Sequence, residues 1–154
     1  MTDGDGTIVF LCFGNICRSP FAERYWNALV DRSLRTGPRA TSAGFHDTSN
    51  RETPKPFVEL AAEFGVDLES HRSRIVSREL LMNSEVILMM DKRNQQALAD
   101  SFPELMERAT FLGSYAPQTP DEIADPWGKT PEVARDCYRD LASAVDGLWE
   151  HLCR

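Results

Sequence analysis

A cysteine and an arginine separated by five residues form the strongest chemical signal in this sequence. Cys12 and Arg18 enclose the segment Phe13-Gly14-Asn15-Ile16-Cys17. Backbone N–H groups of so short a loop can converge on a tetrahedral oxyanion, and a helix that follows adds the partial positive charge of its N-terminus. Arg18 can donate two parallel hydrogen bonds to the anion, and Cys12 beneath it can attack as a thiolate. We therefore predict that residues 12–18 hold a phosphate group above a nucleophilic sulfur.

The residues inside and after this loop suit the same geometry. Gly14 permits a positive φ and a close approach to the anion, and Asn15 tolerates the left-handed conformation. Ser19 is a favourable N-cap and Pro20 suits the first helical turn, while the Ser19 hydroxyl can also hydrogen-bond to the sulfur of Cys12. The loop lacks the Gly-Lys-Ser/Thr ending of a Walker-type phosphate loop.

A second chemical candidate lies far along the chain, in Asp125-Pro126-Trp127. Cleavage of a phosphate ester needs a proton on the leaving oxygen, and a carboxylic acid that supplies it contributes about 10²–10⁴ in rate. An Asp-Pro pair is also common in ordinary turns, so the spacing alone leaves both interpretations open. Trp127 is a candidate for the wall of a substrate pocket or for packing of this proline-rich loop.

Apolar stretches alternate with helical patterns along the chain. Strands are predicted at residues 7–12, 39–43, 86–90 and 110–112, and helices at residues 19–34, 54–65, 92–99 and 134–152, with a turn near 103–107. This alternation predicts an α/β fold, a three-layer sandwich with a central four-stranded parallel sheet and helices on both faces. The phosphate loop then follows strand one, at the sheet edge where such folds bind ligands. We expect a single domain over residues 7–154 after a disordered segment, residues 1–6.

Composition narrows the function classes. The chain has 154 residues, of which 42% are hydrophobic, and a net charge of -7. Such an acidic chain is a poor partner for nucleic acid and favours substrates whose phosphosites are flanked by basic residues. No apolar run is long enough for membrane insertion. Four irregularly spaced cysteines argue against a secreted disulfide scaffold, so we expect a cytoplasmic protein. The partner expectation is a monomer or a weak dimer. The three histidines are scattered, and neither a metal nor another cofactor is expected.

The stretch from Val9 to Glu23 resembles the N-terminal signature of the low-molecular-weight protein tyrosine phosphatases. The likeness extends from about Thr7 to the last helix. Its later landmarks, in the expected order, are Thr41-Ser42-Ala43-Gly44, Ser70-His71-Arg72-Ser73-Arg74, Met90-Asp91-Lys92-Arg93 and Ile123-Ala124-Asp125-Pro126-Trp127. The glycine that follows Trp127, Gly128, resembles the residue found there in bacterial members of the family.

This resemblance implies a catalytic set of three residues: Cys12 as nucleophile, Arg18 on the phosphate and Asp125 as general acid and base. It also implies phosphate binding by loop residues Phe13, Gly14, Asn15, Ile16, Cys17 and Arg18, loop bracing by Asn15, Ser19, Ser42 and His71, and substrate walls from Trp127 and Phe13. Cys17 resembles a redox partner that protects the nucleophile from over-oxidation. Asp91, at the end of the third predicted strand, is a weaker candidate for orienting the site and is not included in the predicted site residues.

The implied reaction is hydrolysis of phosphotyrosine in proteins, with a bacterial tyrosine kinase of exopolysaccharide synthesis as a candidate substrate. Phosphoarginine hydrolysis is one alternative, although members with that preference tend to carry threonine at the position of Ile16. Thiol-dependent arsenate reduction is another, but it needs further cysteines near the third strand, and residues 80–91 contain none. Residues 45–50 leave open whether Phe45, His46 or Thr48 lines the second wall.

Overall fold

The computed structural model of this chain describes residues 7–33 and 37–153. In chain order its elements are β1 (Thr7–Cys12), α1 (Arg18–Arg32), β2 (Ala40–Gly44), α2 (Lys55–Ala62), α3 (Arg78–Met82), β3 (Ser84–Met89), α4 (Lys92–Ser101), the 3-10 helix η1 (Pro103–Arg108), β4 (Ala109–Phe111), the 3-10 helix η2 (Leu112–Tyr115) and α5 (Pro131–Leu152). The segment predicted to be disordered, residues 1–6, lies outside the described residues.

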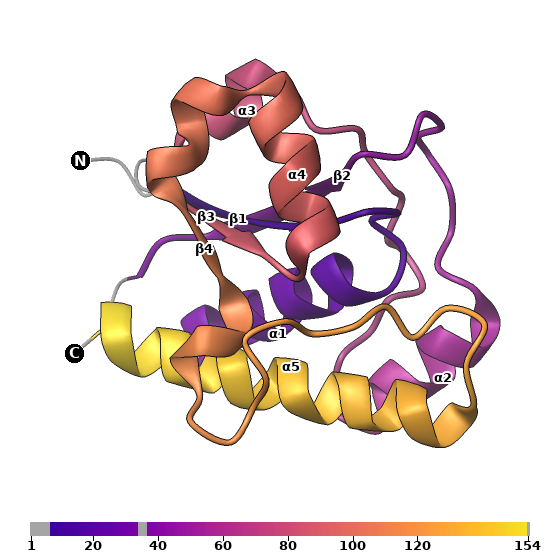
Figure 1. Cartoon of the computed structure of the whole chain (residues 1–154). Coiled ribbons are helices and arrows are strands. Elements are labelled where there is room, and N and C mark those ends of the chain that lie inside the picture. Colours follow the sequence, from indigo (N-terminus) through magenta and orange to yellow (C-terminus); the bar gives the residue numbers. More distant parts are fainter. Residues whose placement is uncertain (1–6, 34–36, 154) are drawn as a thin grey trace.

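Four parallel strands form one sheet in the order β2-β1-β3-β4 (Figure 1). The register sets Cys12 opposite Gly44 on β2, and Leu11 opposite Met89 on β3. Since the chain leaves β1 toward β2 on one side and later returns to β3 on the other, the carboxyl end of β1 is the point at which the strand order reverses. Open α/β sheets bind ligands at such a point. The predicted four-stranded parallel sheet is confirmed.

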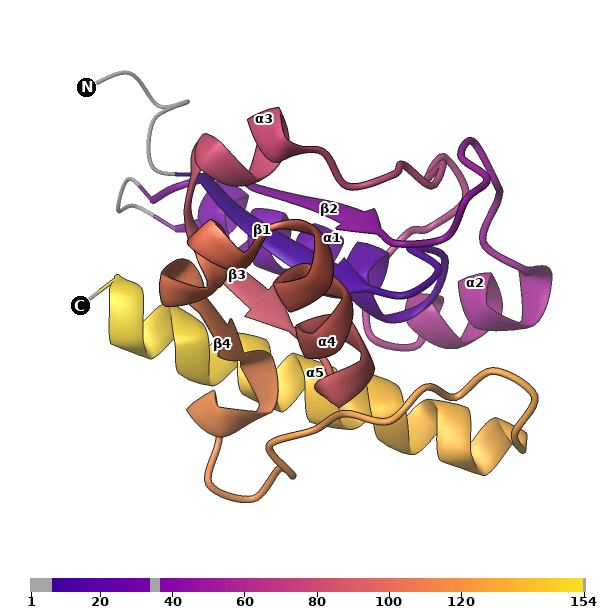
Figure 2. The ribbon, with the colours of Figure 1, turned by 45° about the horizontal axis from the view of Figure 1, so that its top comes forward.

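Helices cover both faces of the sheet, with α1, α2 and α5 on one face and α3 and α4 on the other (Figures 1 and 2). Side chains of a strand alternate between the two faces. Ile8 and Phe10 of β1 therefore join the larger core against α1 and α5, while Val9 and Leu11 join the smaller core under α3 and α4. Helices on both faces and the apolar residues on each side of β1 confirm the predicted three-layer sandwich.

The predicted elements agree with the structure to within a few residues. All four strands are present, and the helix predicted to begin at Ser19 starts one residue earlier. The sequence reading missed α3, a single turn that begins where the Ser77 side chain accepts the N–H of Leu80. A five-residue helix contains too little periodicity to be recognised from its pattern. Within the described residues, no helix is both long and apolar enough to cross a membrane.

Candidate active site

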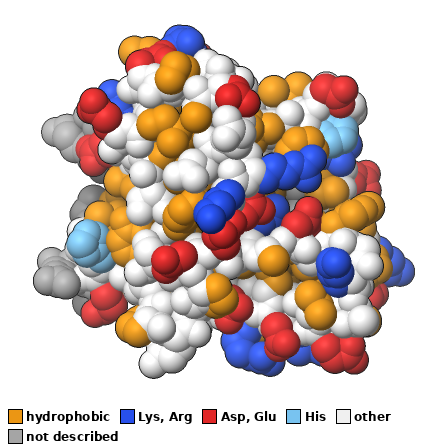
Figure 3. All heavy atoms as spheres, in the orientation of Figure 1, with side chains coloured by type: hydrophobic (Ala, Val, Ile, Leu, Met, Phe, Trp, Pro, Cys, Tyr) orange, Lys and Arg blue, Asp and Glu red, His pale blue; other side chains and the backbone are white. Residues whose placement is uncertain are grey.

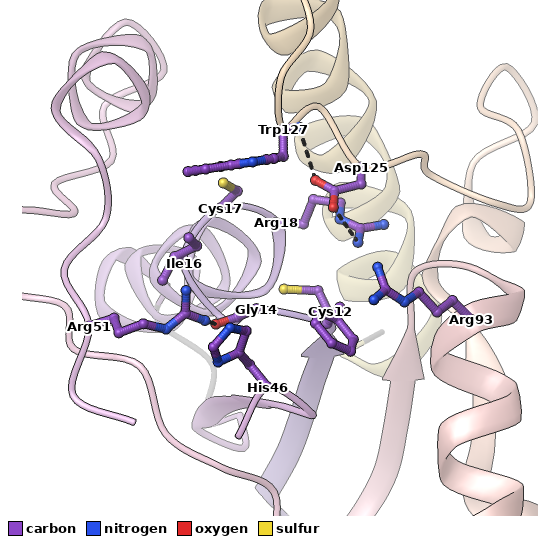
Figure 4. Close-up of a pocket in the computed structure, with 11 residues that line it drawn as sticks. Cys12, Gly14, Ile16, Cys17, Arg18, His46, Arg51, Arg93, Asp125 and Trp127 are labelled. Carbon is purple, nitrogen blue, oxygen red and sulfur yellow. Dashed lines mark hydrogen bonds and ion pairs between the residues drawn. The ribbon is translucent and has the colours of Figure 1, made fainter. Parts of the chain in front are cut away.

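Cys12 ends β1, and its sulfur lies at the floor of a pocket of about 300 Å³ (Figure 4). The sulfur accepts hydrogen bonds from the backbone N–H groups of Asn15 at 3.2 Å and of Ser19 at 3.4 Å. The Ser19 hydroxyl lies 3.0 Å from the same sulfur. Because that hydroxyl already accepts the Asn15 amide at 2.8 Å, its own hydrogen is available to the sulfur. Three donors therefore surround the sulfur, an environment that stabilises a thiolate.

The loop after Cys12 has its carbonyl oxygens engaged by donors from outside it. The Phe13 oxygen accepts the N–H groups of residues 45 and 46, and the Gly14 oxygen accepts the Arg51 guanidinium at 2.7 Å. The Asn15 oxygen accepts His71 Nε2 at 2.8 Å, and the Cys17 oxygen accepts the Tyr138 hydroxyl at 3.3 Å. These four hydrogen bonds hold the loop from outside, while within the loop the N–H of Asn15 is directed at the Cys12 sulfur.

Asn15 carries the unusual backbone conformation of the loop, with a φ of 54°. Its side chain donates to both Ser19 Oγ and Ser42 Oγ, the latter at 2.9 Å, and its Oδ1 accepts the N–H of Arg74 at 2.8 Å. The buried amide thereby joins the loop to β2 and to the segment before α3. Of the two residues that the sequence offers for a positive φ, Asn15 adopts it and Gly14 does not. A Cβ at Gly14 would instead lie 3.3 Å from the Arg51 guanidinium.

Ser19 is not the N-cap that the sequence suggested. The helix α1 begins at Arg18, the N-cap position is Cys17, and no side chain caps it. Since the Ser19 hydroxyl is engaged with the sulfur and with Asn15, it is not free to cap the helix.

Arg18 is only 2% exposed and is fixed by two acceptors. Its Nη1 donates to Oδ2 of Asp91 at 2.7 Å and to the carbonyl oxygen of Ile123 at 2.6 Å, while Nη2 lies 3.9 Å from Oδ2 of Asp125. Burial by itself lowers the pKa of Arg18, but the neighbouring Cys12 and Asp91 outweigh it and hold the pKa above its ordinary value. The guanidinium thus remains charged beside the sulfur. Asp91 was omitted from the predicted site, although an acid at the carboxyl end of a central strand was a usable signal.

Asp125 and Trp127 approach the pocket from the loop that precedes α5 (Figure 4). Asp125 Oδ1 accepts the N–H of Trp127 at 3.0 Å, which leaves Oδ2 directed toward Arg18 and the pocket. Trp127 is 57% exposed, and its ring stacks on Phe57 of α2 at 6.2 Å with an interplanar angle of 17°. A carboxyl group and a flat apolar surface from the same loop therefore line the pocket that contains the Cys12 sulfur.

Three further side chains line the pocket that the sequence did not assign to the site: His46, Arg51 and Arg93. His46 contacts the Phe13 ring edge-on at 5.9 Å, so among the open candidates at residues 45–50 it is the one that reaches the pocket. Arg93, in the first turn of α4, places its guanidinium 3.5 Å from the centre of the Phe13 ring. These side chains come from two segments outside the phosphate loop, and only the folded chain brings them together.

Two predicted bracing residues lie behind the loop. His71 is buried, and burial lowers its pKa more than the hydrogen bond to Asn15 and the nearby Glu23 raise it. His71 is therefore neutral and donates through Nε2 to the Asn15 carbonyl. Ser42 accepts the Asn15 amide and donates to Glu23 Oε1 at 2.6 Å. Both side chains contact the loop rather than the pocket.

None of the four cysteines forms a disulfide. Cys17 lines the pocket but is buried, and burial together with the neighbouring Cys12 raises its pKa well above the ordinary range. Its thiol is therefore protonated. Cys137 lies on the buried face of α5, where burial raises its pKa to about 12. Across residues 7–33 and 37–153, no group of three or more His, Cys, Asp or Glu side chains is arranged to hold a metal ion.

Comparison with known proteins agrees with this geometry. The chain is 34% identical over 131 residues to the low molecular weight protein-tyrosine-phosphatase Wzb of Escherichia coli K12, covering 85% of this chain and 84% of that protein. It is 30% identical over 145 residues to a protein-arginine-phosphatase of Geobacillus stearothermophilus, covering 94% and 95%. The crystal structure of the Erwinia amylovora tyrosine phosphatase AmsI superimposes with a TM-score of 0.86 at 27% identity, covering 97% of this chain and 95% of that one.

The model of one sequence family matches nearly the whole chain. Residues 7–154 match the family described as low molecular weight phosphotyrosine protein phosphatase. The match begins at β1 and includes the phosphate loop, both walls of the pocket and the last helix. The chain belongs to the low molecular weight phosphotyrosine protein phosphatase family.

Proposed function

We propose that this protein hydrolyses phosphotyrosine in proteins through a cysteinyl-phosphate intermediate. The observation that carries the proposal is the sulfur of Cys12, which receives two backbone N–H groups and lies beside a hydroxyl in a pocket that Arg18 and Asp125 also line. A thiolate nucleophile, a fixed guanidinium and a proton donor are the groups that phosphate-ester cleavage requires.

The first step transfers the phosphoryl group to sulfur. The Cys12 thiolate attacks phosphorus, and the bond between phosphorus and the phenolic oxygen breaks as Asp125 Oδ2 gives that oxygen its proton. Loop N–H groups and Arg18 hold the equatorial oxygens, where negative charge builds in the transition state. Tyrosine leaves, the phosphoryl group is bonded to Cys12, and Asp125 is ionised.

Hydrolysis of the intermediate returns the enzyme to its starting state. A water molecule attacks phosphorus while the Asp125 carboxylate takes its proton, and the bond between sulfur and phosphorus breaks. The Ser19 hydroxyl, 3.0 Å from the sulfur, stabilises the thiolate as it departs. Inorganic phosphate, the thiolate of Cys12 and a protonated Asp125 result, so protons and charges balance over the cycle.

The walls of the pocket favour an aromatic ester. Ile16, Phe13 and Trp127 all line it, and the stacking of Trp127 on Phe57 sets the indole plane beside the opening. A phenyl ring between such surfaces buries apolar area, which contributes about 25 cal/mol per Å². The apolar Ile16 therefore supports phosphotyrosine rather than phosphoarginine as the substrate.

Phosphoarginine remains the second candidate, because one relative of comparable identity bears the name protein-arginine-phosphatase. A phosphoguanidine carries charge and several N–H donors, which an isoleucine cannot accept. Ile16→Thr supplies a hydroxyl acceptor at this wall, and we expect it to move the preference toward phosphoarginine peptides. The ratio of kcat/KM for the two peptide classes measures this directly.

For the cellular setting we propose the cytoplasm and, as a protein substrate, a bacterial tyrosine kinase. Four cysteines without a disulfide among them, one of them the proposed nucleophile, suit a reducing compartment. The relatives named above are bacterial, and Wzb bears the name of a tyrosine phosphatase, which supports a bacterial phosphotyrosine protein as the substrate.

The decisive experiment compares phosphotyrosine, phosphoserine and phosphoarginine peptides with wild type and Cys12→Ser. We expect wild type to prefer phosphotyrosine and the variant to lose nearly all activity, since a serine hydroxyl is a far weaker nucleophile here. Phosphate release unchanged by Cys12→Ser would rule out the mechanism. A preference for phosphoarginine would replace the substrate and keep the mechanism.

A further inference from the structure

Two arginines flank the mouth of the phosphate pocket and have no carboxylate partner in the described part of the chain. Arg51 approaches from the loop after β2 and Arg93 from α4, on opposite sides of Cys12 (Figure 4). Most of the other arginines that the structure describes form ion pairs with carboxylates. These are the arginines at positions 18, 24, 39, 72, 78, 135 and 139. The space-filling view shows Lys or Arg side chains at the hollow in the centre of this face, with Asp or Glu side chains beside them (Figure 3).

Arg93 is held where its charge faces an incoming substrate. Its guanidinium lies 3.5 Å from the centre of the Phe13 ring, and Phe13 directly follows the nucleophile Cys12. A cation over an aromatic face at this distance is attracted to it, which restrains an otherwise flexible side chain. Arg93 is exposed, so its remaining N–H groups are open to a ligand. The stacking thus presents a fixed positive charge at the rim of the pocket.

Arg51 is restrained in a different way. Its Nη2 donates to the Gly14 carbonyl at 2.7 Å and its Nε donates to the Thr48 carbonyl at 3.3 Å. Both acceptors are neutral, so the charge of the guanidinium is not neutralised by them. A guanidinium has five N–H donors, and these two bonds leave others free.

The remaining charges near the pocket are already engaged. Arg18 is paired with Asp91, and Asp125 holds the N–H of Trp127 while facing the leaving oxygen. His46, which also lines the pocket, accepts the N–H of Thr48 at its Nδ1, 3.0 Å away. Once a phosphate dianion occupies the loop, Arg51 and Arg93 therefore remain as positive charges on either side of it. This local field is opposite in sign to the net charge of the chain.

We propose that Arg93, with Arg51 across the pocket, forms an anion subsite that binds an aspartate or glutamate side chain next to the phosphotyrosine of the substrate. The proposal rests on the proposed function and adds the sequence context of the phosphosite. It reverses the expectation from net charge, which favoured basic flanking residues. Short-range ion pairing at the rim outweighs the long-range field, because salt screens charges separated by more than about 8 Å at physiological ionic strength.

The test uses phosphotyrosine peptides that differ only in the residues beside the phosphotyrosine, which are glutamate, alanine or lysine. We expect wild type to give the highest kcat/KM with the acidic peptide. Arg93→Gln should lower the ratio of kcat/KM for the acidic peptide to kcat/KM for the lysine peptide by about two- to fivefold, the range typical of an exposed charge pair. Arg93→Glu should invert the order, and high salt should reduce the preference of wild type.

Lys92→Gln is the matched control. Lys92 precedes Arg93 on the same turn of α4, carries the same charge and is exposed, but it lies outside the pocket lining. We expect its ratio of acidic to lysine peptide to equal that of wild type. An equal fall in both variants would mean that total charge, rather than a subsite, sets the preference, and would overturn the proposal.

Other outcomes separate this proposal from the proposed function. Equal kcat/KM for acidic and lysine phosphotyrosine peptides with wild type overturns the subsite and leaves the phosphatase activity intact. The same loss on every substrate with Arg93→Glu, including a small aryl phosphate, assigns Arg93 to the phosphate itself and also overturns the subsite. Failure of wild type to cleave any phosphotyrosine peptide would instead refute the proposed function.

Discussion

The carboxylate of Asp91 accepts a hydrogen bond from the guanidinium of Arg18 at 2.7 Å, and little of either side chain reaches water. The other oxygen of Asp91 accepts the N–H of Asn94 at 3.0 Å, and the Asn94 side chain accepts the N–H of Asp91 in return, so the same residue caps α4. One carboxylate therefore fixes Arg18 of α1, the arginine proposed to bind phosphate, to the helix that follows β3. We propose that Asp91 positions Arg18 without contacting the substrate.

Replacement of Asp91 by asparagine separates these two tasks. Asparagine caps a helix about as well as aspartate, so the free energy of unfolding should change less than in Asp91→Ala, which also loses a cap contributing about 1 kcal/mol. With the anion removed, Arg18 is held less firmly. We expect kcat/KM for an aryl phosphate to fall about tenfold, short of the 10²–10³ that follows loss of an oxyanion donor itself.

Steady-state kinetics and urea unfolding of Asp91→Asn and Asp91→Ala measure both effects. Arg18→Lys serves as the reference variant, because it keeps a positive charge near the phosphate but changes its position, and its kcat/KM is compared with that of Asp91→Asn. Wild-type kinetics in Asp91→Asn would show that the Ile123 carbonyl, at 2.6 Å, suffices to hold Arg18.

The phosphate loop could be predicted because its information is contiguous in sequence. Residues 7–20 contain the strand, the loop and the start of the helix in one run, and the chemistry of Cys12 and Arg18 follows from their spacing on that frame. Even here the details depended on tertiary contacts. Gly14 and Asn15 both suit a positive φ, and Asn15 adopts it because its amide donates to Ser19 and Ser42, which offsets the strained conformation.

The rim of the pocket could not be predicted in the same way. His46, Arg51 and Arg93 belong to a loop and a helix that sequence separates from Cys12 by tens of residues. An arginine in a polar stretch is usually a solvated surface charge. The sequence around Arg93 and Arg51 does not indicate that Arg93 packs on the Phe13 ring or that Arg51 donates to the Gly14 carbonyl. Only the packing of β2, β3 and α4 around β1 brings these charges together.

Acid should destabilise the fold partly through His71. Burial holds the pKa of folded His71 below the ordinary histidine value of about 6.5. Between that value and the lower folded pKa, the unfolded chain binds a proton that the folded chain does not, so the free energy of unfolding falls as the pH falls. The contribution of neutral His71 to the free energy of unfolding is fully present above about pH 6.5. His71→Gln keeps an N–H donor for the Asn15 carbonyl but does not titrate.

We therefore expect the free energy of unfolding, from urea titrations on either side of pH 6.5, to decline less steeply with acid in His71→Gln than in wild type. His151→Gln is the control, because His151 is exposed in the last turn of α5 and should leave the slope as in wild type. Parallel slopes for His71→Gln and wild type would mean that the imidazole is protonated alike in the folded and unfolded chain.

Gly44 faces the phosphate loop so closely that it has no room for a side chain. A Cβ there would lie 2.6 Å from the Phe13 carbonyl oxygen and 3.0 Å from the N atom of Asn15, both backbone atoms that cannot rotate away. We expect Gly44→Ala to push the loop outward, lower the free energy of unfolding by about 1–3 kcal/mol and weaken inhibition by inorganic phosphate. Gly37→Ala, whose nearest contact is Cys153 Sγ at 3.5 Å, should leave both unchanged. Equal phosphate inhibition in Gly44→Ala and Gly37→Ala would show that the loop tolerates the shift.

Asp125 makes the sharpest prediction, because its role depends on the leaving group. Oδ1 accepts the N–H of Trp127 at 3.0 Å, which leaves Oδ2 to carry the transferable proton. Asp125→Asn preserves an acceptor for that N–H but cannot supply a proton. We expect kcat/KM for phenyl or alkyl phosphates to fall by about 10²–10⁴, and kcat/KM for a nitrophenyl phosphate to fall much less, since nitrophenolate departs without protonation. A plot of log kcat/KM against leaving-group pKa should therefore become steeper in the variant, because kcat/KM reports the steps up to phosphoryl transfer and not the later hydrolysis. The same proportional loss for every leaving group would identify Asp125 as a residue that shapes the loop rather than as the acid.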